Sequence, residues 1–318
     1  MSQVDVAVIG AGPAGIAAAL AAADAGANTL LVDEGTRAGG HLRWRISLTL
    51  ENDPGFGLSP AVGPEFADQL VERIQARGNL ELRLETVAWG LFDDNLLGLS
   101  SANGAKEITA GAIVIATGST DLVAPFPGWT LPGVMTARAA QIFIHVHRVL
   151  PGRAWAILGD SHEADELQRD LELAGATVVV RANDPETLRA SGTNRLAHAE
   201  VGDDVYELDA LAIALGRQPD AELALQAMAE ATFSESLGGF TTLRDQDCET
   251  SAPDVFIAGD AAGIGSLAEI VAEGRLAGLA AAGADAAKLA DARAERDAAM
   301  SNARAAALEE LHLRPAGA

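Results

Sequence analysis

Three glycines near the start of the chain have the spacing of a phosphate-binding turn. They are Gly10, Gly12 and Gly15 in VDVAVIGAGPAGIAAAL, a run that opens as an apolar strand and continues as an Ala-rich helix through Pro13 and Ala14. The first glycine permits a tight turn, the second leaves the backbone open to a pyrophosphate, and the third lets the helix lie close to the strand. Unpaired N–H groups at the start of the helix then face the phosphates.

An acidic residue follows at the place where such a unit binds a ribose. A second strand ends at Asp33, twenty-three residues after Gly10, and its carboxylate can accept hydrogen bonds from ribose hydroxyls. Glu34 is able to share this role. Because a carboxylate repels a 2′-phosphate, we expect FAD, NAD or an adenine nucleotide rather than NADP. The alternative is a glycine-rich turn without a ligand, and the surrounding strand, helix and acidic residue argue against it.

Small residues recur at three other places. Gly39 and Gly40 are adjacent in a loop that either presses against a ligand or is merely flexible. The apolar runs at 112–119 and 254–263 read as buried parallel strands whose carboxyl ends meet the ligand, at Ala116, Thr117, Gly118 and Gly259. Asp260 in the second run needs a partner if it is buried, such as a sugar hydroxyl or a helix N-terminus. A plain N-cap for the following helix is the alternative role.

The middle of the chain repeats the strand–helix–strand plan with a different turn. We expect a strand at 154–158, a helix at 163–174 and a strand at 177–180. The turn GDSHEA at 159–164 keeps only the first glycine, and its acidic side chains oppose a pyrophosphate by charge and by bulk. We therefore expect this domain to retain the fold and to have lost the nucleotide site.

These patterns predict an α/β protein with two Rossmann-like dinucleotide-binding domains of the glutathione-reductase type, the second inserted into the first. Residues 208–220 repeat the strand-then-glycine plan and close the inserted domain. The expected bounds are 1–121 and 249–284 for the first domain, 122–248 for the inserted domain and 285–318 for a helical tail. That tail either covers a partner or is simply solvated, and the second interpretation is favoured. Elsewhere in the first domain we expect a loop at 48–64, a helix at 63–78 and one strand at 80–87.

Composition excludes several functions. The 318 residues carry a formal net charge of −23, so neither a nucleic acid nor an anionic membrane is an expected partner. The single cysteine, Cys248, leaves no pair for a disulfide or a redox dithiol and too few thiolates for an iron–sulfur cluster. Glycine, proline and aspartate interrupt the first apolar run, and no basic region precedes it. We therefore expect no signal peptide, no membrane span and a cytoplasmic protein.

Two sets of residues that suggest chemistry are not expected to perform it. His145 and His147 have no Cys or Asp nearby to complete a ligand set, so no metal is expected in this chain. The neighbours of Cys248 are Asp247 and Glu249, whose charges disfavour a thiolate and argue against a nucleophile. No Ser/His/Asp arrangement has a recognisable local pattern, so no catalytic proton-transferring residue is assigned.

The chain resembles the two-dinucleotide-domain flavoprotein superfamily, which includes thioredoxin reductase and the ferredoxin reductases, at its glycine turn, Asp33-Glu34, Ala116-Thr117-Gly118 and Gly259-Asp260. In that superfamily the first domain holds FAD and the inserted domain holds NAD(P)H. The resemblance implies that the three glycines take the pyrophosphate, Asp33 the adenosine ribose and Asp260 the ribityl chain. The full set of expected cofactor-binding residues is Gly10, Gly12, Pro13, Ala14, Gly15, Asp33, Glu34, Gly39, Gly40, His41, Arg43, Val87, Ala116, Thr117, Gly118, Gly259 and Asp260.

A narrower resemblance is carried by PFPGWTLPGVMT at 125–136, AGGHLR at 38–43 and GDAAGIG at 259–265. These runs resemble the flavin subunit of heteromeric amine dehydrogenases, a group that includes opine oxidases, D-hydroxyproline dehydrogenase and hydrogen cyanide synthase. The α subunit of heterotetrameric sarcosine oxidase is a more distant member. The resemblance implies an FAD-binding subunit that carries electrons from oxidation of an amine C–N bond, with room for a second nucleotide or flavin at a subunit interface. The implied partners are a catalytic subunit related to D-amino-acid oxidase and a small iron–sulfur subunit.

Two departures from this group leave other functions open. Its members often carry Gln where His41 stands, and many continue into a Cys-rich iron–sulfur domain for which this chain lacks the cysteines. One alternative is a self-sufficient NAD(P)H-dependent reductase of the ferredoxin-reductase type. Another is a non-catalytic scaffold that holds ATP or NAD. A thioredoxin-reductase activity is excluded, because a sequence with one cysteine contains no dithiol to relay electrons.

Overall fold

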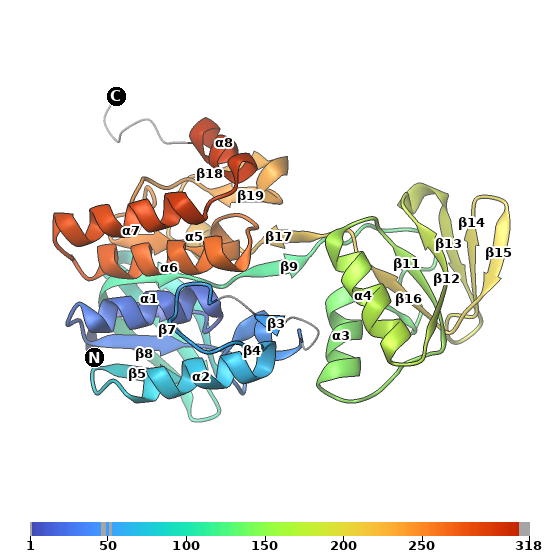
Figure 1. The fold of residues 1–318 in the computed structure, drawn as a ribbon, viewed down its shortest axis with the longest axis horizontal. Helices are drawn as coiled ribbons and strands as arrows, with labels where there is room; N and C mark the ends of the chain where they lie inside the picture. Colours follow the sequence, from blue (N-terminus) through green and yellow to red (C-terminus); the bar gives the residue numbers. More distant parts are fainter. Residues whose placement is uncertain (1, 46–48, 51–52, 312–318) are drawn as a thin grey trace. The chain divides into compact units, whose positions relative to one another are not determined.

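A seven-stranded sheet lies at the centre of the first of two structural units (Figure 1). The structure is a computed structural model that describes residues 2–45, 49–50 and 53–311. The strand order is β5-β2-β1-β8-β7-β6, and β20 also pairs with β8. The strands β5, β2, β1, β8 and β20 are parallel, whereas β6, β7 and β8 form an antiparallel meander. Their bounds are β1 Ser2–Ile9, β2 Thr29–Val32, β5 Leu80–Arg83, β6 Thr86–Phe92, β7 Leu96–Ser101, β8 Gly104–Ile115 and β20 Val255–Ile257.

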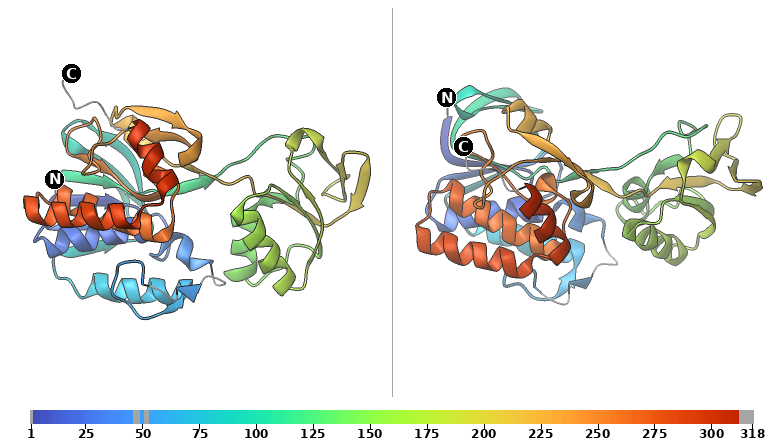
Figure 2. Two further views of the ribbon diagram at one scale, coloured as in Figure 1. Left: turned by 45° about the horizontal axis from the view of Figure 1, so that its top comes forward. Right: turned by 90° about the horizontal axis from the view of Figure 1, so that it is seen from above.

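Both faces of this sheet are covered, which explains why its parallel strands read as continuous apolar runs. Val6 and Val8 of β1 pack into one buried cluster with α1, α2 and α6, while Ala7 and Ile9 pack into another with α5 and the meander. The helices are α1 Pro13–Asp24, α2 Gly63–Gln75, α5 Glu222–Gln226, α6 Leu267–Ala281, α7 Ala286–Ala299 and α8 Asn302–Leu311. The views agree that α6 and α7 run side by side (Figures 1 and 2).

Two glycines bring α6 against α1, the helix that begins at the glycine turn. A Cβ on Gly274 would lie 2.2 Å from the carbonyl oxygen of Ala14, and one on Gly278 would lie 2.1 Å from that of Ala18. Any side chain at these positions would therefore force the two helices apart. This contact holds α1 and α6 side by side on the same face of the sheet.

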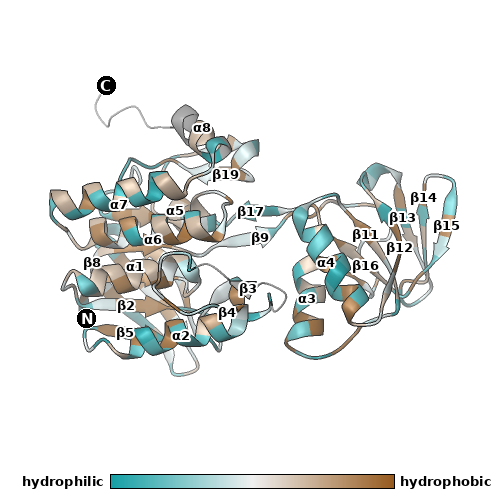
Figure 3. Cartoon of the chain, viewed as in Figure 1, coloured by the Kyte–Doolittle hydropathy of each residue, from teal (hydrophilic) through white to brown (hydrophobic). Residues whose placement is uncertain are grey.

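The second unit is built on a four-stranded parallel sheet of order β10-β16-β11-β12. Helices α3 and α4 pack on it, and Figure 3 shows both hydrophilic and hydrophobic stretches along α4, as an amphipathic helix requires. A three-stranded antiparallel sheet, β13-β14-β15, completes the unit. The bounds are β10 Val134–Thr136, α3 Ala137–His145, β11 Ala154–Leu158, α4 His162–Leu173, β12 Thr177–Ala182, β13 Leu188–Ser191, β14 His198–Val201, β15 Asp204–Glu207 and β16 Ala210–Ile213.

The second unit interrupts the first in the sequence, and the predicted fold class is confirmed. The first unit comprises Met1–Arg43, Leu48–Ser119 and Gln218–Ala318, and the second comprises Trp44–Ser47 and Thr120–Arg217. The chain leaves and re-enters the first unit through two paired strands, β9 Ser119–Asp121 and β17 Arg217–Pro219. Within the described ranges, no helix combines the length and the apolar character needed to cross a membrane.

The inserted unit ends earlier than the sequence suggested, at Arg217 instead of residue 248. Residues 218–248 group with the first unit because Leu223 and Ala224 of α5 are buried in the core cluster on one face of its sheet. A hairpin of β18 Ala231–Ser234 and β19 Gly239–Thr242 follows, and the side chain of Thr241 donates to the carbonyl of Ala262 at 2.8 Å.

Three local expectations were wrong. The single strand expected at 80–87 is broken at Glu85, whose φ of 49° turns the chain between β5 and β6. Part of the expected loop at 48–64 pairs as β3 Thr49–Leu50 with β4 Ala61–Val62. The C-terminal tail is not simply solvated, because α7 packs on α6 with Ala292 buried and α8 buries Arg304.

Candidate nucleotide-binding site

The three glycines of the first turn have different surroundings. A Cβ on Gly10 would lie 2.3 Å from the carbonyl oxygen of Ala116, and one on Gly15 would lie 1.8 Å from that of Gly10. A Cβ on Gly12, in contrast, would meet no atom within 4 Å. Packing therefore requires two of these glycines, whereas the space beside Gly12 is open. Such a space is what a phosphate lying against the backbone needs.

Helix α1 begins without a side-chain cap. Its N-cap is Gly12, which has no side chain to offer, and Pro13 contributes no N–H donor. The first turn also contains no acidic residue. The N-terminal end of α1 therefore keeps its partial positive charge, and an anion can bind there.

Asp33 joins the end of β2 to the glycine turn. One carboxylate oxygen accepts the N–H of Ala11 at 2.6 Å, and the other accepts the N–H of Gly35 at 2.7 Å. Each oxygen has a further lone pair, so a ribose hydroxyl can still donate to it. Glu34 is exposed beside it. Val87 is 43% exposed and follows Thr86, whose N–H donates to the carbonyl of Asp33.

The loop with adjacent glycines packs directly on the glycine turn. The N–H of Gly39 donates to the carbonyl of Ala11 at 2.7 Å, and a Cβ on Gly40 would lie 2.8 Å from the Cα of Gly12. Arg43 holds this loop, because its guanidinium donates to the carbonyl of Ala38 and to the carboxylate of Asp68. These bonds tie the loop to the glycine turn. His41 and Arg43 belong to one short 3-10 turn, Gly40–Arg43.

The carboxyl ends of β8 and β20 lie side by side, with Ile115 paired to Ile257. The segments that follow are Ala116–Gly118 and Gly259–Asp260. A Cβ on Gly259 would lie 2.5 Å from the Cβ of Ala14, which places this loop against the first turn of α1. Thr117 donates its hydroxyl to the carbonyl of Asp220 at 2.7 Å, and a Cβ on Gly118 would meet no atom within 4 Å.

Asp260 is 7% exposed and forms bonds within this loop region. Its carboxylate accepts the hydroxyl of Ser119 at 3.3 Å and the N–H of Gly265 at 3.1 Å. The N-terminus of α6 is instead closed by a capping box between Ser266 and Glu269. The alternative role of Asp260 as the N-cap of the following helix is therefore wrong.

The structure thus assembles the expected segments where the parallel strands β1, β2, β8 and β20 end. In open α/β sheets this edge is where ligands bind. Sequence analysis missed Ala11, whose N–H donates to Asp33 and whose carbonyl accepts from Gly39. It also missed Glu273 on α6, which accepts the N–H of Gly259 at 2.8 Å. Ala11 acts through its backbone and leaves no sequence signal, whereas Glu273 is an acidic residue in an Ala-rich helix.

The equivalent turn of the second unit is closed by its own side chains. Ser161 caps α4 by accepting the N–H of Ala164 at 3.2 Å. Glu163 in the first turn lies 3.0 Å from the guanidinium of Arg217. Burial opposes ionisation of Glu163, but its backbone N–H and the nearby Arg217 bring its pKa below the usual value. A carboxylate therefore stands at the helix end that would otherwise attract an anion.

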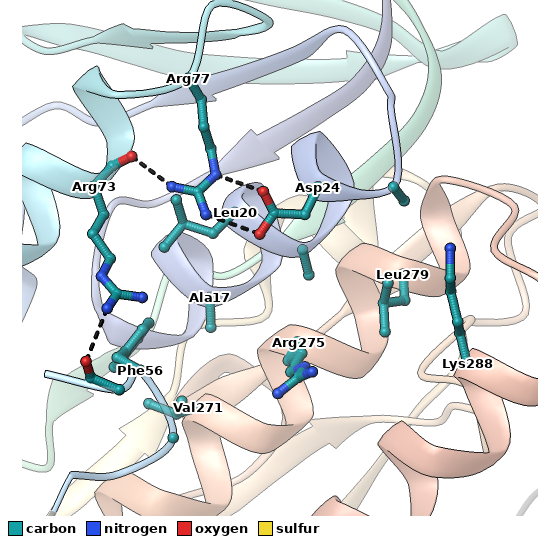
Figure 4. Close-up of a pocket in the computed structure, with 14 residues that line it drawn as sticks. Ala17, Leu20, Asp24, Phe56, Arg73, Arg77, Val271, Arg275, Leu279 and Lys288 are labelled. Carbon is teal, nitrogen blue, oxygen red and sulfur yellow. Dashed lines mark hydrogen bonds and ion pairs between the residues drawn. The ribbon is translucent and has the colours of Figure 1, made fainter.

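A separate pocket of about 380 Å³ opens beside α1, away from the glycine turn (Figure 4). Arg73 and Arg77 lie on one side of it, and Arg275 lies on another. These cations have protein partners: Arg77 binds Asp24 at 2.7 Å, Arg73 donates to the carbonyl of Gly57, and Arg275 pairs with Glu295. None of the expected cofactor-binding residues lines this pocket.

The histidines and the cysteine have structural surroundings. His145 lies 3.0 Å from the carboxylate of Asp170 inside the second unit. Burial and the charge of Glu273 raise the pKa of Cys248 to about 12, so its thiol is inert. The main cause is burial, and not the charges of Asp247 and Glu249 that the sequence suggested. In the parts of the chain that the structure describes, no three His, Cys, Asp or Glu residues are grouped to hold a metal ion.

The fold and this site define a protein built on two units of the dinucleotide-binding type. Residues 4–159 match the family model described as pyridine nucleotide-disulphide oxidoreductase. The A subunit of opine oxidase from Rhizobium meliloti (strain 1021) is 30% identical over 330 residues, which cover 88% of this chain and 71% of the relative. The alpha subunit of sarcosine oxidase from the same strain is 34% identical over 189 residues, or 55% of this chain and 18% of the relative.

Among solved structures, L-proline dehydrogenase from P. horikoshii has a TM-score of 0.76 and 29% sequence identity to this chain. The match covers 91% of this chain and 59% of the dehydrogenase chain, so this chain spans little more than half of that relative. The protein belongs to the pyridine nucleotide-disulphide oxidoreductase family and is an FAD-dependent oxidoreductase. The resemblance noted from the sequence is confirmed.

Proposed function

We propose that the chain is the FAD-binding subunit of a heteromeric dehydrogenase or oxidase that oxidises the C–N bond of an opine- or hydroxyproline-type amine. The contrast between its two turns is the observation that carries this proposal. The first turn has open space at Gly12 and an uncapped helix, whereas Ser161 and Glu163 fill the second. Electrons then reach the flavin from a substrate or a partner and not from NAD(P)H. The relatives named as subunits of opine oxidase and sarcosine oxidase support this division of labour.

FAD fits the residues of the first unit. Gly12 and the first turn of α1 take the pyrophosphate, with Gly10 and Gly15 shaping the turn, while Asp33 takes the adenosine ribose and Asp260 the ribityl chain. FAD supplies the capacity to accept two electrons. The protein binds and orients it, and the packed loop that contains Gly40 and His41 closes over the turn. Thr117 and Gly118 follow β8 at the same edge of the sheet and would face the same cofactor.

The proposed partners are a catalytic subunit related to D-amino-acid oxidase and a small iron–sulfur subunit. The names of three relatives describe subunits of larger enzymes, namely opine oxidase, sarcosine oxidase and hydrogen cyanide synthase. A second nucleotide or flavin would sit at an interface with such a partner. The cytoplasmic location stays a prediction from the sequence.

The visible spectrum of the purified chain tests the cofactor. We expect flavin bands near roughly 370 and 450 nm, and FAD in the supernatant after heat denaturation. A colourless preparation that releases ATP or NAD would contradict the proposal and favour the non-catalytic scaffold. The division of labour is tested separately: efficient oxidation of an amine by the isolated, flavin-loaded chain would refute it.

A self-sufficient NAD(P)H-dependent reductase is the second candidate. The observation in its favour is that the inserted unit keeps a parallel sheet and the turn at Gly159. This candidate predicts that NADH or NADPH bleaches the flavin bands within seconds under anaerobic conditions. Our proposal predicts that the bands persist until a reduced partner or dithionite is added.

A further inference from the structure

The loop that contains Asp260 is bonded to three buried charged residues. Glu273 of α6 is 1% exposed, and its carboxylate accepts the N–H of Gly259 at 2.8 Å. Arg244 and Arg304 both pair with this carboxylate, the latter at 3.1 Å. They are 7% and 4% exposed. We call Glu273, Arg244 and Arg304 the loop clamp.

The two arginines also bind the far end of the same loop. Arg244 donates to the carbonyl of Ala262 at 2.7 Å, and Arg304 donates to the carbonyl of Gly263 at 2.6 Å. The clamp therefore bonds the first residue of the loop and its last two. Asp260 lies between these fixed points.

Gly259–Ala262 of this loop forms one turn of 3-10 helix, and a glycine stands at each end of the segment. Gly259 has a φ of +74° and Gly263 a φ of +130°, conformations that glycine reaches without strain and leaves as easily. Two glycines at the ends of a five-residue segment would allow Asp260 many positions. Hydrogen bonds from guanidinium groups with fixed geometry restrict it to one.

Stability alone does not explain three buried charges. Replacing a buried ion-pair network by apolar residues of similar volume is often neutral or stabilising, because removing the charges from water is costly. The Nε of Arg304 is buried without a hydrogen-bond partner, which adds to that cost. What the clamp provides instead is a single loop conformation.

The C-terminal helix takes part through Arg304. The start of α8 is anchored again where the N–H of Ser301 donates to the carboxylate of Glu269 at 2.8 Å. Glu269 belongs to the capping box at the start of α6, directly after the loop. Helix α8, at residues 302–311, therefore bonds the loop through Arg304, and the residue before the helix, Ser301, bonds the start of α6.

We propose that Glu273, Arg244 and Arg304 position the Gly259–Gly263 loop, and with it Asp260, for the cofactor, so that α8 is a structural part of the cofactor site. The proposal rests on the proposed function. Because coupling between two sites is reciprocal, the cofactor also stabilises the docked state of α8. All three clamp residues are positioning residues, since they act through the loop.

The test compares Arg304→Met with Arg293→Met in the full-length chain. Arg293 makes a bidentate pair with Asp247 at 2.6 Å, in a more exposed place than Arg304, and no bond to the loop, so it is a control for the loss of an ion pair away from the loop. We expect Arg304→Met to weaken FAD binding by about tenfold or more, the effect of one lost charge-assisted contact. Arg293→Met should stay within about twofold of the unmodified protein. Arg304→Lys, which keeps the charge, should recover part of the affinity.

Amide hydrogen exchange gives a readout that does not depend on FAD. In the apoprotein, Arg304→Met should speed exchange across residues 259–265 and leave the segment around Gly12 unchanged. The proposal is overturned if folded Arg304→Met has the same exchange rates and the same FAD affinity as the unmodified protein. If this variant does not fold, the same two measurements on Arg304→Lys decide. If the unmodified chain binds no FAD, the proposed function fails, and exchange at 259–265 still tests the clamp.

Discussion

Replacing Gly12 by alanine separates ligand binding from folding. The backbone of Gly12 has φ −77° and ψ −179°, which alanine adopts without strain, and the added Cβ would meet no protein atom within 4 Å. Gly15→Ala is the matched control in the same turn. Its Cβ would lie 1.8 Å from the carbonyl oxygen of Gly10, so the fold itself must shift. Only the first substitution should act through the ligand alone.

The expected magnitudes follow from these contacts. For Gly12→Ala, the reduced freedom of the unfolded chain stabilises by about 0.4–1 kcal/mol, and the poorer N-cap offsets this by up to about 1 kcal/mol. The apoprotein should therefore change by less than about 1 kcal/mol. Overpacking at Gly15 costs about 1–3 kcal/mol or more, which lowers Tm by roughly 2–4 °C per kcal/mol.

For FAD binding, in contrast to stability, Gly12→Ala should have the larger effect of the two substitutions. The methyl group on residue 12 occupies the space proposed for the pyrophosphate and removes one or two charge-assisted hydrogen bonds of about 1.5–3 kcal/mol each. The Kd for FAD should rise at least tenfold. Titration of apoprotein with FAD, followed by flavin fluorescence, measures this Kd, and circular dichroism gives the Tm. Unchanged FAD affinity in Gly12→Ala would refute the placement of the phosphates at this turn.

Three further predictions concern other parts of the chain. Gly278→Ala should destabilise the first unit by about 1–3 kcal/mol in urea denaturation, because its Cβ would lie 2.1 Å from the carbonyl of Ala18. Arg217→Met should cost less than about 1 kcal/mol at pH 7. The pKa of Glu163 is lowered despite burial, so this difference should stay constant above the usual value of 4.5 and shrink as pH falls through the lowered pKa. A difference that grows in acid would contradict the assignment. Because burial raises the pKa of Cys248 to about 12, Ellman's reagent should label no thiol in the native protein and one per chain in urea.

The arrangement of the first unit was predictable because buried parallel strands have a recognisable sequence pattern and bind ligands at their carboxyl ends. Apolar runs that end in small residues predicted buried strands before Ala116 and Gly259, and the structure pairs these strands, β8 and β20, as neighbours. The position of Asp33 beside the turn followed from the length of one strand–helix–strand unit. These features depend on local periodicity and on glycine, both of which a single sequence displays.

Long-range polar contacts were not predictable in the same way. Arg304 reads as one charge on a solvated helix, and nothing near it in sequence indicates a carboxylate thirty-one residues away. The break at Glu85 was also hidden, because a glutamate with positive φ is disfavoured locally and tertiary contacts must hold it there. Side-chain bonds between distant segments therefore required the structure.

The two glycine turns are built on one backbone plan. The N–H of Gly10 donates to Val32 and that of Gly159 to Ala182, each at 2.8 Å and each across to the end of the next strand. The turns differ in the residues after the shared glycine. At the turn after Gly159, the side chain of Ser161 accepts an N–H from the first turn of α4. Its hydroxyl donates to a carbonyl at 2.8 Å. Donors that could bind a phosphate are therefore already used. Removing that hydroxyl alone would not open the site, because the carboxylate of Glu163 would still repel the anion. The two turns therefore share a strand–turn–helix backbone plan, although the sheets around them differ in size, and we propose that a few side chains at the turn decide whether a nucleotide binds.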